Sequence, residues 1–332
     1  MHVVEITSFG DPDVLVYAET EAPSPGPGEV LVTVSAAGVN RADILQRQGR
    51  YPPPPGASSW PGLEISGVVA EVGTGVTRWR AGDRVAGLLA GGGYASMAVV
   101  PEGQLLAVPD HLDLVDAAAL PEAVCTAWSN LVDAGGLASG DHVLVHGGSG
   151  GVGTAAVQLA AALGAHVLVT ARDDDRVEQC RALGADAGFA YRRPEGEDLA
   201  EALPDLVRDA TGGHGADVVL DVVGGRYLDA NVRSLATGGT LVVIGTQQGR
   251  RGELDLGRLM ARRARVVGTT LRSRPPEDKA RIVADVAASA WPMLDDGRLR
   301  PVVHARIPLA EAARAHRLLD SGDVFGKVLL VT

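Results

Sequence analysis

Short apolar runs divide the chain into two parts with different spacing. Up to about residue 120, β-branched runs such as 29–34, 67–72 and 94–100 alternate with glycine and proline turns. This close spacing is typical of a compact antiparallel barrel or sandwich. Beyond residue 120 the apolar runs are separated by stretches of helical length, which predicts a parallel sheet.

The second part carries six predicted strands, at 142–147, 166–171, 186–190, 217–223, 240–245 and 265–270. Six strands with intervening helices complete a Rossmann-type doubly wound parallel sheet, so we expect an α/β fold. The elements after Leu271 have no place in that completed sheet, and we expect them to return to the first part. They are a helix at 277–296, a strand at 302–304, a helix at 309–320 and a strand at 327–331. The predicted domains are residues 1–121 with 274–332, and residues 122–273.

A glycine-rich turn follows the first predicted parallel strand. The pattern is Gly148-x-Gly150-x-x-Gly153, directly after an apolar run and before a helix predicted over 151–163. In dinucleotide-binding turns the first glycine permits a tight turn, the second lets a pyrophosphate approach, and the third permits close helix packing. The positive end of the helix would then face the phosphates. The predicted cofactor-binding residues here are Ser149, Gly150, Gly151, Val152 and Gly153, and the less favoured alternative is a turn that binds nothing.

Composition narrows the class of protein and the partners. A chain of 332 residues suggests two domains, and a net charge of −11 argues against nucleic acid or an anionic membrane as partner. The first residues lack the basic flank and apolar core of a signal peptide. Cys125 and Cys180 show neither metal spacing nor a disulfide framework, which favours a reducing, cytoplasmic location. The eight histidines are interpreted as scattered surface or turn residues, and no metal site is predicted.

The end of the second parallel strand indicates which nicotinamide cofactor binds. NAD-specific folds place an acidic residue there to hold the ribose 2′-hydroxyl, whereas this chain has Ala171 followed by Arg172. Arg172 and Arg176 can contact a 2′-phosphate through charge-assisted hydrogen bonds, which predicts NADPH. Asp173 and its two acidic neighbours leave an alternative, because Asp173 could take the hydroxyl or all three could charge a helix N-terminus.

Several segments carry a family resemblance that spans essentially the whole chain. They are 36–56, 61–67, 75–85, 120–123, the glycine turn and 325–328. On these segments the chain resembles the zinc-independent quinone oxidoreductases of the medium-chain dehydrogenase/reductase superfamily, and among them the p53-inducible quinone oxidoreductase type. The resemblance implies that the first domain is a GroES-like antiparallel β-barrel catalytic domain.

The ligands of the superfamily's catalytic zinc are missing from the matching positions. Zinc alcohol dehydrogenases have a cysteine where this chain has Asn40 and a histidine where it has Leu63, and the third ligand position falls near Glu122. One carboxylate cannot hold a tetrahedral zinc ion alone. Without a Lewis acid, alcohol dehydrogenation is disfavoured, whereas hydride delivery to an acceptor that is already electrophilic by conjugation remains feasible.

The resemblance also implies which residues face the cofactor and the acceptor. Asn40 would orient the acceptor oxygen, and Tyr51 would donate a hydrogen bond or a proton to it, with a packing role for the Tyr51 ring equally weighted. Arg272 and Lys327 would contact phosphate or support domain closure, with a solvated surface as the alternative for Arg272. Tyr191 would pack beside the 2′-phosphate. The remaining implied cofactor-binding residues are Thr126, Ile244, Gly245, Thr246 and Leu271.

Three functions and one assembly follow from these observations. The leading hypothesis is NADPH-dependent reduction of a quinone, followed by NADPH-dependent reduction of the C=C bond of an enone or enoyl thioester. The alternative of another class is an NADPH-binding protein with little turnover. An exposed β-branched edge strand at 265–270 predicts a homodimer. The sequence does not specify the physiological acceptor.

Overall fold

The computed structural model describes residues 1–192 and 198–332 and divides into two compact units. Unit 1 comprises Met1–Cys125 with Leu271–Thr332, and unit 2 comprises Thr126–Thr270. The sequence placed the divisions at 121/122 and 273/274. The first structural division falls inside helix α2 (Pro121–Trp128), which continues from one unit into the other.

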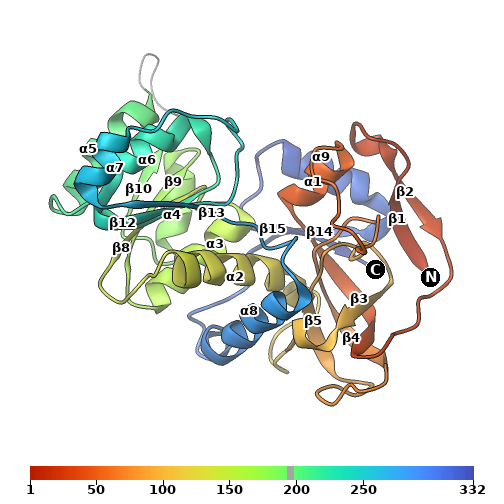
Figure 1. Ribbon diagram of the computed structural model, residues 1–332. Helices are drawn as coiled ribbons and strands as arrows, with labels where there is room; N and C mark the ends of the chain where they lie inside the picture. The colour runs from red at the N-terminus through yellow and green to blue at the C-terminus, as the bar shows by residue number, and fades with distance from the viewer. Residues whose placement is uncertain (193–197) are drawn as a thin grey trace. The chain divides into compact units, whose positions relative to one another are not determined.

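Unit 2 is built on six parallel strands (Figure 1). Their order is β10-β9-β8-β11-β12-β13, and every neighbouring pair is parallel. This is the Rossmann order, so the predicted doubly wound sheet is confirmed. The strands are β8 (His142–His146), β9 (His166–Ala171), β10 (Ala187–Ala190), β11 (Ala216–Asp221), β12 (Leu235–Val243) and β13 (Arg265–Gly268).

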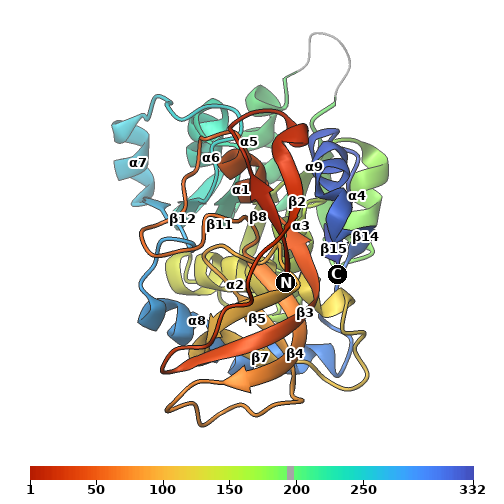
Figure 2. The same cartoon turned by 90° about the vertical axis from the view of Figure 1, so that its right-hand side faces the viewer.

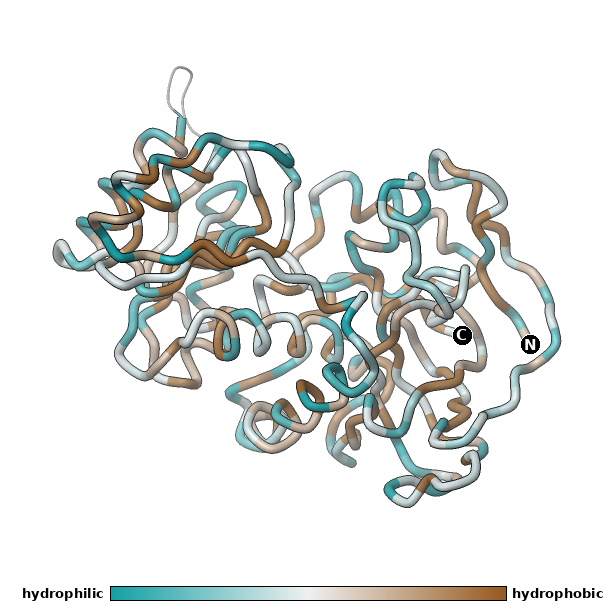
Figure 3. The backbone as a smooth tube through the Cα atoms, in the orientation of Figure 1, coloured by the Kyte–Doolittle hydropathy of each residue, from teal (hydrophilic) through white to brown (hydrophobic). Residues whose placement is uncertain are grey.

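The helices of unit 2 connect the strands in two directions. Those leading from β8 toward β10 contact β8, β9 and β10, whereas those leading back through β11 and β12 contact β10 and β12. Right-handed crossovers place the two groups on opposite faces of the sheet. They are α3 (Gly151–Ala162), α4 (Asp174–Arg181), α5 (Leu199–Ala210), α6 (Leu228–Ser234) and α7 (Leu256–Arg262), and the unit also contains the π-helix η4 (Ser129–Ala134) and the 3₁₀ turn η5 (Gly225–Tyr227). Figure 3 shows the apolar stretches that run along the strands of this sheet.

Unit 1 contains a seven-stranded sheet of the order β14-β15-β3-β4-β5-β7, with β6 paired to β3. Figure 2 shows β3, β4, β5 and β7 beside one another. All pairs are antiparallel except β14 with β15. The strands are β3 (Glu29–Val39), β4 (Glu64–Val72), β5 (Arg84–Leu88), β6 (Met97–Pro101), β7 (Leu105–Ala107), β14 (Val303–Pro308) and β15 (Lys327–Val331), and β1 (His2–Ile6) pairs separately with β2 (Leu15–Glu19).

The trailing strands β14 and β15 join the sheet of unit 1, as the sequence predicted, because β15 pairs with β3. The helix predicted at 277–296 is instead α8 (Pro276–Ser289) followed by the 3₁₀ turn η6 (Trp291–Leu294), since Pro292 lacks the N–H that would continue the helix. The other helices are α1 (Arg41–Arg47) and α9 (Ala312–Asp320), with 3₁₀ turns η1 (Pro12–Val14), η2 (Glu102–Gln104), η3 (Asp116–Ala119) and η7 (Leu309–Glu311).

Each unit has its own apolar core. In unit 1 the core gathers inward residues of β3, β4, β5 and β15 with those of α9, and Val30, Ile65 and Val328 are fully buried. In unit 2 Leu144 and Leu241 from the sheet pack with α5 and α6. No helix among the described residues has the length and apolar character needed to cross a bilayer.

Candidate functional site

The glycine-rich turn after β8 is anchored on β9. The N–H of Gly148 donates to the carbonyl of Thr170 at 3.0 Å, and the N–H of Gly147 donates to the Thr170 hydroxyl at 3.3 Å. The residue with a left-handed backbone is Gly147, at φ +67°. The tight turn therefore depends on Gly147, one residue before the glycine to which the sequence pattern assigned it.

The three glycines of the predicted pattern differ in what surrounds them. A Cβ on Gly148 would lie 2.9 Å from the Cβ of Val169, and a Cβ on Gly153 would lie 2.1 Å from the carbonyl oxygen of Gly147. Gly153 therefore permits α3 to pack on the turn itself rather than on the strand. A Cβ on Gly150 would meet only the Gly147 oxygen, at 3.4 Å, so this glycine is not needed for packing.

The start of α3 fits a pyrophosphate group. Gly150 is the N-cap of α3, and Ser149, Gly150, Gly151 and Val152 all keep accessible surface. The first N–H groups of a helix have no intrahelical acceptor and carry partial positive charge. A glycine that packing does not require, placed at this helix start, leaves room for the oxygens of a phosphate.

The predicted 2′-phosphate residues lie together at the ends of β9 and β10. Arg172 follows β9 directly, Arg176 lies in the first turn of α4, and Tyr191 follows β10, where its N–H donates to the carbonyl of Ala171 at 2.9 Å. Tyr191 is 46% exposed and Arg176 is 9% exposed. The side chains of Arg176 and Tyr191 thus both lie at the carboxyl edge of the sheet.

Asp173 caps helix α4. Its carboxylate accepts the N–H of Arg176 at 3.0 Å and the Nε–H of Arg172 at 3.1 Å. The backbone hydrogen bond from Arg176, followed by the contact with Arg172, holds the pKa of Asp173 below its usual value. The carboxylate therefore serves the helix N-terminus and the neighbouring arginine, which is one of the two alternatives that the sequence left open.

Three other predicted cofactor residues of unit 2 lie at the same carboxyl edge. Ile244, Gly245 and Thr246 follow β12 directly, and the N–H of Ile244 donates to the carbonyl of Asp221 at the end of β11. The buried Asp221 carboxylate accepts the N–H of Val223 at 2.6 Å. Because β8 and β11 are neighbours at the point where the strand order reverses, the glycine turn lies where open α/β sheets bind ligands. Thr126 is buried at the start of the unit.

In unit 1, Asn40, Glu64 and Lys327 form a buried polar cluster, named here the Lys327 cluster. The ammonium of Lys327 lies 2.5 Å from Oε1 of Glu64 and donates to Oδ1 of Asn40 at 2.6 Å. Nδ2 of Asn40 donates to the same Glu64 oxygen at 2.9 Å. The residues are 3%, 0% and 8% exposed for Lys327, Glu64 and Asn40. The side-chain amide of Asn40 thus forms hydrogen bonds with both members of the ion pair.

The sheet of unit 1 brings the three residues of the Lys327 cluster together. Asn40 follows β3, Glu64 begins β4 and Lys327 begins β15, and both β4 and β15 pair with β3. Gly38 makes the close approach possible, since a Cβ there would lie 2.2 Å from Oε1 of Glu64. The second Glu64 oxygen accepts the N–H of Glu122 at 2.9 Å, so both carboxylate oxygens are satisfied.

The Lys327 cluster does not fit the catalytic zinc of the superfamily. Asn40 uses its amide oxygen for Lys327, and Leu63, at the position of a histidine ligand, is a buried apolar side chain. The Glu64 carboxylate already holds a cation, the Lys327 ammonium, at 2.5 Å. These positions therefore offer neither the nitrogen and sulfur donors nor the uncompensated charge that a tetrahedral zinc ion requires.

Arg272 holds the segment that carries Tyr51. Its guanidinium lies 5.3 Å from the centre of the Tyr51 ring and donates to the carbonyls of Ala90 at 2.8 Å and Tyr51 at 3.3 Å and to Oε1 of Gln46 at 2.6 Å. Arg272 is only 5% exposed, and burial lowers the pKa of its guanidinium. The solvated-surface alternative for Arg272 is therefore wrong. Leu271, beside it, is 9% exposed.

A second buried polar chain, which the sequence did not predict, lies beside the Lys327 cluster. Arg47 contacts Nδ1 of His316 at 3.4 Å, Nε2 of His316 lies 3.0 Å from the Tyr94 hydroxyl, and that hydroxyl donates to Asp43 at 3.4 Å. Because arginine can only donate, Nδ1 accepts and Nε2 carries the proton. Asp43 also accepts the N–H groups of Asn40 and Gly62, both at 2.8 Å, so it fixes the backbone of the residue that binds Lys327.

Burial is the main cause of the pKa shifts of Asp43 and His316 in this series of buried polar residues. It raises the pKa of Asp43 to about 6, against the lowering effect of two backbone hydrogen bonds. It lowers the pKa of His316 to about 3, with Arg47 as the second cause. The signal that sequence reasoning missed is a charged residue inside an apolar run, such as Asp43 beside Ile44 or Glu64 between Leu63 and Ile65, because such residues are buried only when they are paired.

The interpretation of the histidines as scattered surface or turn residues is wrong for several of them. His146 and His316 are buried, at 1% and 0% exposed. The ring of His142 lies 4.9 Å from that of His166 and 5.4 Å from that of His214, so these three gather at the amino edge of the parallel sheet. The reason is register, since His142 and His166 are opposite one another at the first positions of adjacent strands.

Comparison with family models matches both parts of the chain. Residues 26–110 match the alcohol dehydrogenase GroES-like domain, and residues 151–288 match the zinc-binding dehydrogenase domain. A quinone oxidoreductase of Rattus norvegicus is 30% identical over 336 residues, covering 100% of this chain and 98% of that protein. A mycocerosic acid synthase-like polyketide synthase of Mycobacterium tuberculosis is 32% identical over 98% of this chain, but the chain spans only 15% of that protein.

Solved structures of related proteins match this chain over its full length. The Escherichia coli quinone oxidoreductase in complex with NADPH has a TM-score of 0.86 at 29% identity and covers 100% of both chains. An NAD-dependent alcohol dehydrogenase has a TM-score of 0.86 at 34% identity and the same coverage. The CurK enoyl reductase has a TM-score of 0.84 at 25% identity and covers 99% of this chain and 98% of its own.

Proposed function

The chain belongs to the quinone oxidoreductases of the medium-chain dehydrogenase/reductase superfamily, and from that premise we propose that it is an NADPH-dependent reductase of quinones. The observation that carries the proposal is the start of α3, where the capping Gly150 is not needed for packing and leaves room for a pyrophosphate. The reaction would transfer a hydride from the nicotinamide to the conjugated acceptor without a metal ion.

NADPH is the proposed cofactor. A solved relative contains it, and the residues of this chain fit it at the start of α3 and at the end of β9. Arg172, Arg176 and Tyr191 would hold the 2′-phosphate, and Ser149 to Gly153 would hold the pyrophosphate. When bound, NADPH would supply the hydride. Asp173 is already occupied as the α4 cap, which disfavours its use as a ribose ligand in an NADH enzyme.

Tyr51 is the proposed group that contacts the acceptor oxygen. Arg272 contacts the Tyr51 ring and also donates to the Tyr51 carbonyl. Both the side chain and the backbone of Tyr51 are therefore held by the same arginine. A phenol donates a hydrogen bond to an oxygen that gains negative charge as hydride arrives. In this proposal Arg272 is a positioning residue, and the nicotinamide contacts of Leu271 and Thr126 stay predictions.

The Lys327 cluster takes the place of the zinc ligands in this proposal. The amide oxygen of Asn40 accepts from Lys327, and its Nδ2 donates to Glu64 at 2.9 Å and to the Gly38 carbonyl at 3.4 Å. The hydrogen-bonding groups of the Asn40 side chain are therefore used within the protein. The predicted contact of Asn40 with the acceptor stays a prediction. The more strongly supported role of Asn40 is to hold Lys327 in place.

The proposal is tested by following NADPH absorbance with a panel of quinones and enones. We expect kcat/KM to be higher for quinones than for enones and higher with NADPH than with NADH. Tyr51→Phe is expected to lower kcat for quinones by about 100-fold or more, the low end of general acid catalysis. The matched control is Tyr17→Phe, an exposed tyrosine on β2. Unchanged turnover in Tyr51→Phe would rule out an essential hydroxyl, and preference for NADH would refute the cofactor assignment.

Reduction of a C=C bond is the second candidate function. It is favoured by the likeness to the CurK enoyl reductase and to a polyketide synthase, and it also needs no metal. Turnover of enones or enoyl thioesters in preference to quinones would establish it. Binding of NADPH without turnover of any member of the panel would instead indicate the third alternative, a binding protein.

We also propose that two copies pair through β13, the edge strand of the six-stranded sheet. Val266 on β13 is 37% exposed, and Leu256 and Met260 on the adjacent α7 are 63% and 71% exposed. An apolar, unpaired strand edge is an association site. Light scattering is expected to give the mass of a dimer for the native chain and of a monomer for Val266→Lys. A monomeric native chain would refute this proposal. The cytoplasmic location stays a prediction.

A further inference from the structure

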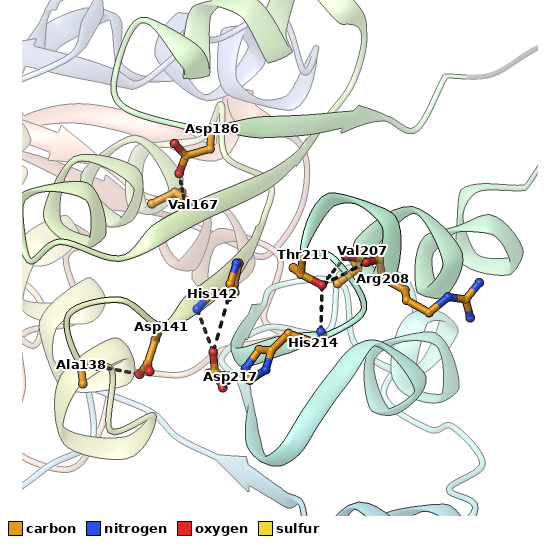
Figure 4. A network of polar contacts seen from close by, with 11 residues as sticks. Ala138, Asp141, His142, Val167, Asp186, Val207, Arg208, Thr211, His214 and Asp217 are labelled. Atoms are coloured by element: carbon orange, nitrogen blue, oxygen red, sulfur yellow. Dashed lines mark hydrogen bonds and ion pairs between the residues drawn. The ribbon is translucent and has the colours of Figure 1, made fainter.

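Three residues converge at the amino edge of the parallel sheet, the opposite end of β8 from the glycine turn. They are His142, which begins β8, Asp217, which lies next to it on β11, and His214, in the turn before β11. One ligand atom from each lies within 4.8 Å of the others (Figure 4). The side chains are 24%, 23% and 53% exposed for His142, Asp217 and His214, so solvent reaches the cluster.

The carboxylate of Asp217 is oriented by the strand beside it. Oδ2 accepts the backbone N–H of His142 at 2.8 Å, while Oδ1 lies 2.8 Å from Nε2 of His214. Nδ1 of His142 lies 3.9 Å from Oδ2. Oxygen and imidazole nitrogen ligands of a tetrahedral metal lie roughly 3.3 Å apart, so these spacings need only small rotations. The N–H of His142 serves as the outer hydrogen bond that orients a metal-binding carboxylate.

One atom of the cluster is buried without a hydrogen-bond partner. Nδ1 of His142 is inaccessible to solvent and has no donor or acceptor within hydrogen-bonding distance among the described residues. An imidazole nitrogen that no other group of the protein engages, and that lies beside a carboxylate, is suited to bind a metal ion.

We propose that His142, His214 and Asp217 bind one divalent transition-metal ion of the zinc class. Two imidazoles and one carboxylate suit zinc, whereas magnesium and calcium prefer sites made of oxygen. The site is separate from the superfamily's catalytic zinc position, which lies in unit 1 and does not fit a metal. The ion would tie together β8, β11 and the turn after α5, and the exposure of His214 leaves one position open to water.

Most of the basic side chains near His214 are paired with carboxylates. His214 lines a surface hollow with Arg208, Arg233, Arg258 and Arg262. The first three lie 2.7 Å from Asp205, 3.9 Å from Asp229 and 3.7 Å from Asp255, and Arg262 donates to the carbonyl of Leu235. Asp217 and Asp141, which precedes His142 in the chain, supply negative charge on the side of His142.

The test is titration of the chelator-treated full-length chain with ZnCl2, followed by calorimetry and by thermal unfolding. We expect one zinc per chain and a rise in Tm of roughly 5–10 °C at 100 times Kd, and no shift with MgCl2. His214→Ala, at an exposed turn, is expected to weaken zinc binding at least tenfold and to abolish the Tm shift while leaving the metal-free Tm close to that of the native chain.

His111→Ala is the matched control. His111 lies 3.9 Å from Asp295 on the surface, with both side chains more than half exposed, and so forms a histidine–aspartate pair without a third ligand. Its loss is expected to leave zinc affinity unchanged. His142→Gln, which keeps the backbone N–H to Asp217, is the second variant and should also weaken binding. Absence of zinc binding at millimolar concentration, or native affinity in both His214→Ala and His142→Gln, would overturn the proposal.

Discussion

Replacement of Lys327 by methionine tests whether the Lys327 cluster is a true buried ion pair. Methionine has nearly the same length and no charge, so the change removes the cation and leaves Glu64 in a site with no accessible surface. The substitution takes away the ammonium that lies 2.5 Å from Glu64 and its hydrogen bond to Asn40 at 2.6 Å. The remaining partners of Glu64 are the Asn40 amide and the N–H of Glu122.

The expected loss of stability follows from this burial. Removal of one partner of a buried ion pair costs about 3–5 kcal/mol, because the other charge stays out of water without compensation. For a protein of this size the loss lowers Tm by roughly 6–20 °C.

Urea denaturation at pH 7 measures the free energy of unfolding, and a double-mutant cycle isolates the pair. Glu64→Gln combined with Lys327→Met removes both charges and keeps an acceptor for the N–H of Glu122. Since paired replacement of buried charges is often close to neutral, we expect the double variant to recover at least about 2 kcal/mol of the loss.

Lys279→Met is the matched control, because Lys279 is the chain's other lysine and is 5% exposed on α8. Burial, followed by Arg272, lowers its pKa, so its charge is not stabilised and its loss is expected to cost little. If Lys327→Met unfolds within about 1 kcal/mol of the native chain, the interpretation of the cluster as a buried ion pair is refuted.

Further predictions concern the glycine turn, the cofactor and the response to acid. Gly150→Ala is expected to keep the native Tm and weaken NADPH binding, whereas Gly153→Ala is expected to lower stability by about 1–3 kcal/mol in unfolding experiments, because its Cβ meets the Gly147 oxygen; equal Tm values would contradict this distinction. Arg176→Ala is expected to raise KM for NADPH about tenfold or more and to leave KM for NADH nearly unchanged, which steady-state kinetics would check. His316, with a pKa of about 3 in the folded chain, stays neutral while the unfolded chain takes up a proton near pH 6.5. The free energy of unfolding therefore decreases as the pH is lowered from about 6.5 toward 3, by up to about 1.36 kcal/mol per pH unit, and His316→Gln should flatten the slope in urea denaturation. An unchanged slope would show that His316 is not held neutral.

The parallel sheet could be predicted because each of its strands is indicated by residues that are close together in the sequence. Each strand is an apolar run followed by a helix, and the Rossmann order follows from the connection rules. The glycine turn could be predicted for the same reason, although the pattern assigned the tight turn to Gly148, whereas the residue with positive φ is Gly147. Tertiary packing decides that detail, since Gly148 lies against Val169.

The buried networks of unit 1 could not be predicted from local patterns. Lys327 and Asn40 are 287 positions apart, and Tyr94 and His316 are 222 positions apart. Their pairing depends on which strands become neighbours in an antiparallel sheet, and a single sequence does not specify that order. For the same reason a solvated surface stayed open as an alternative for Arg272, whose three acceptors come from residues 46, 51 and 90.

The position of β15 between β14 and β3 has a consequence for the order in which the chain can fold as it is synthesised. Unit 2 is encoded entirely before β15, so its parallel sheet can form while the chain is still being made. The sheet of unit 1 has to wait, with the β3 edge open and the Glu64 carboxylate without its cation, until residues 327–331 arrive. During that interval unit 1 exposes a strand edge that invites pairing with other chains. Residues 327–331 therefore have two effects when they arrive. They complete the Lys327 cluster, and they cover the open edge of β3.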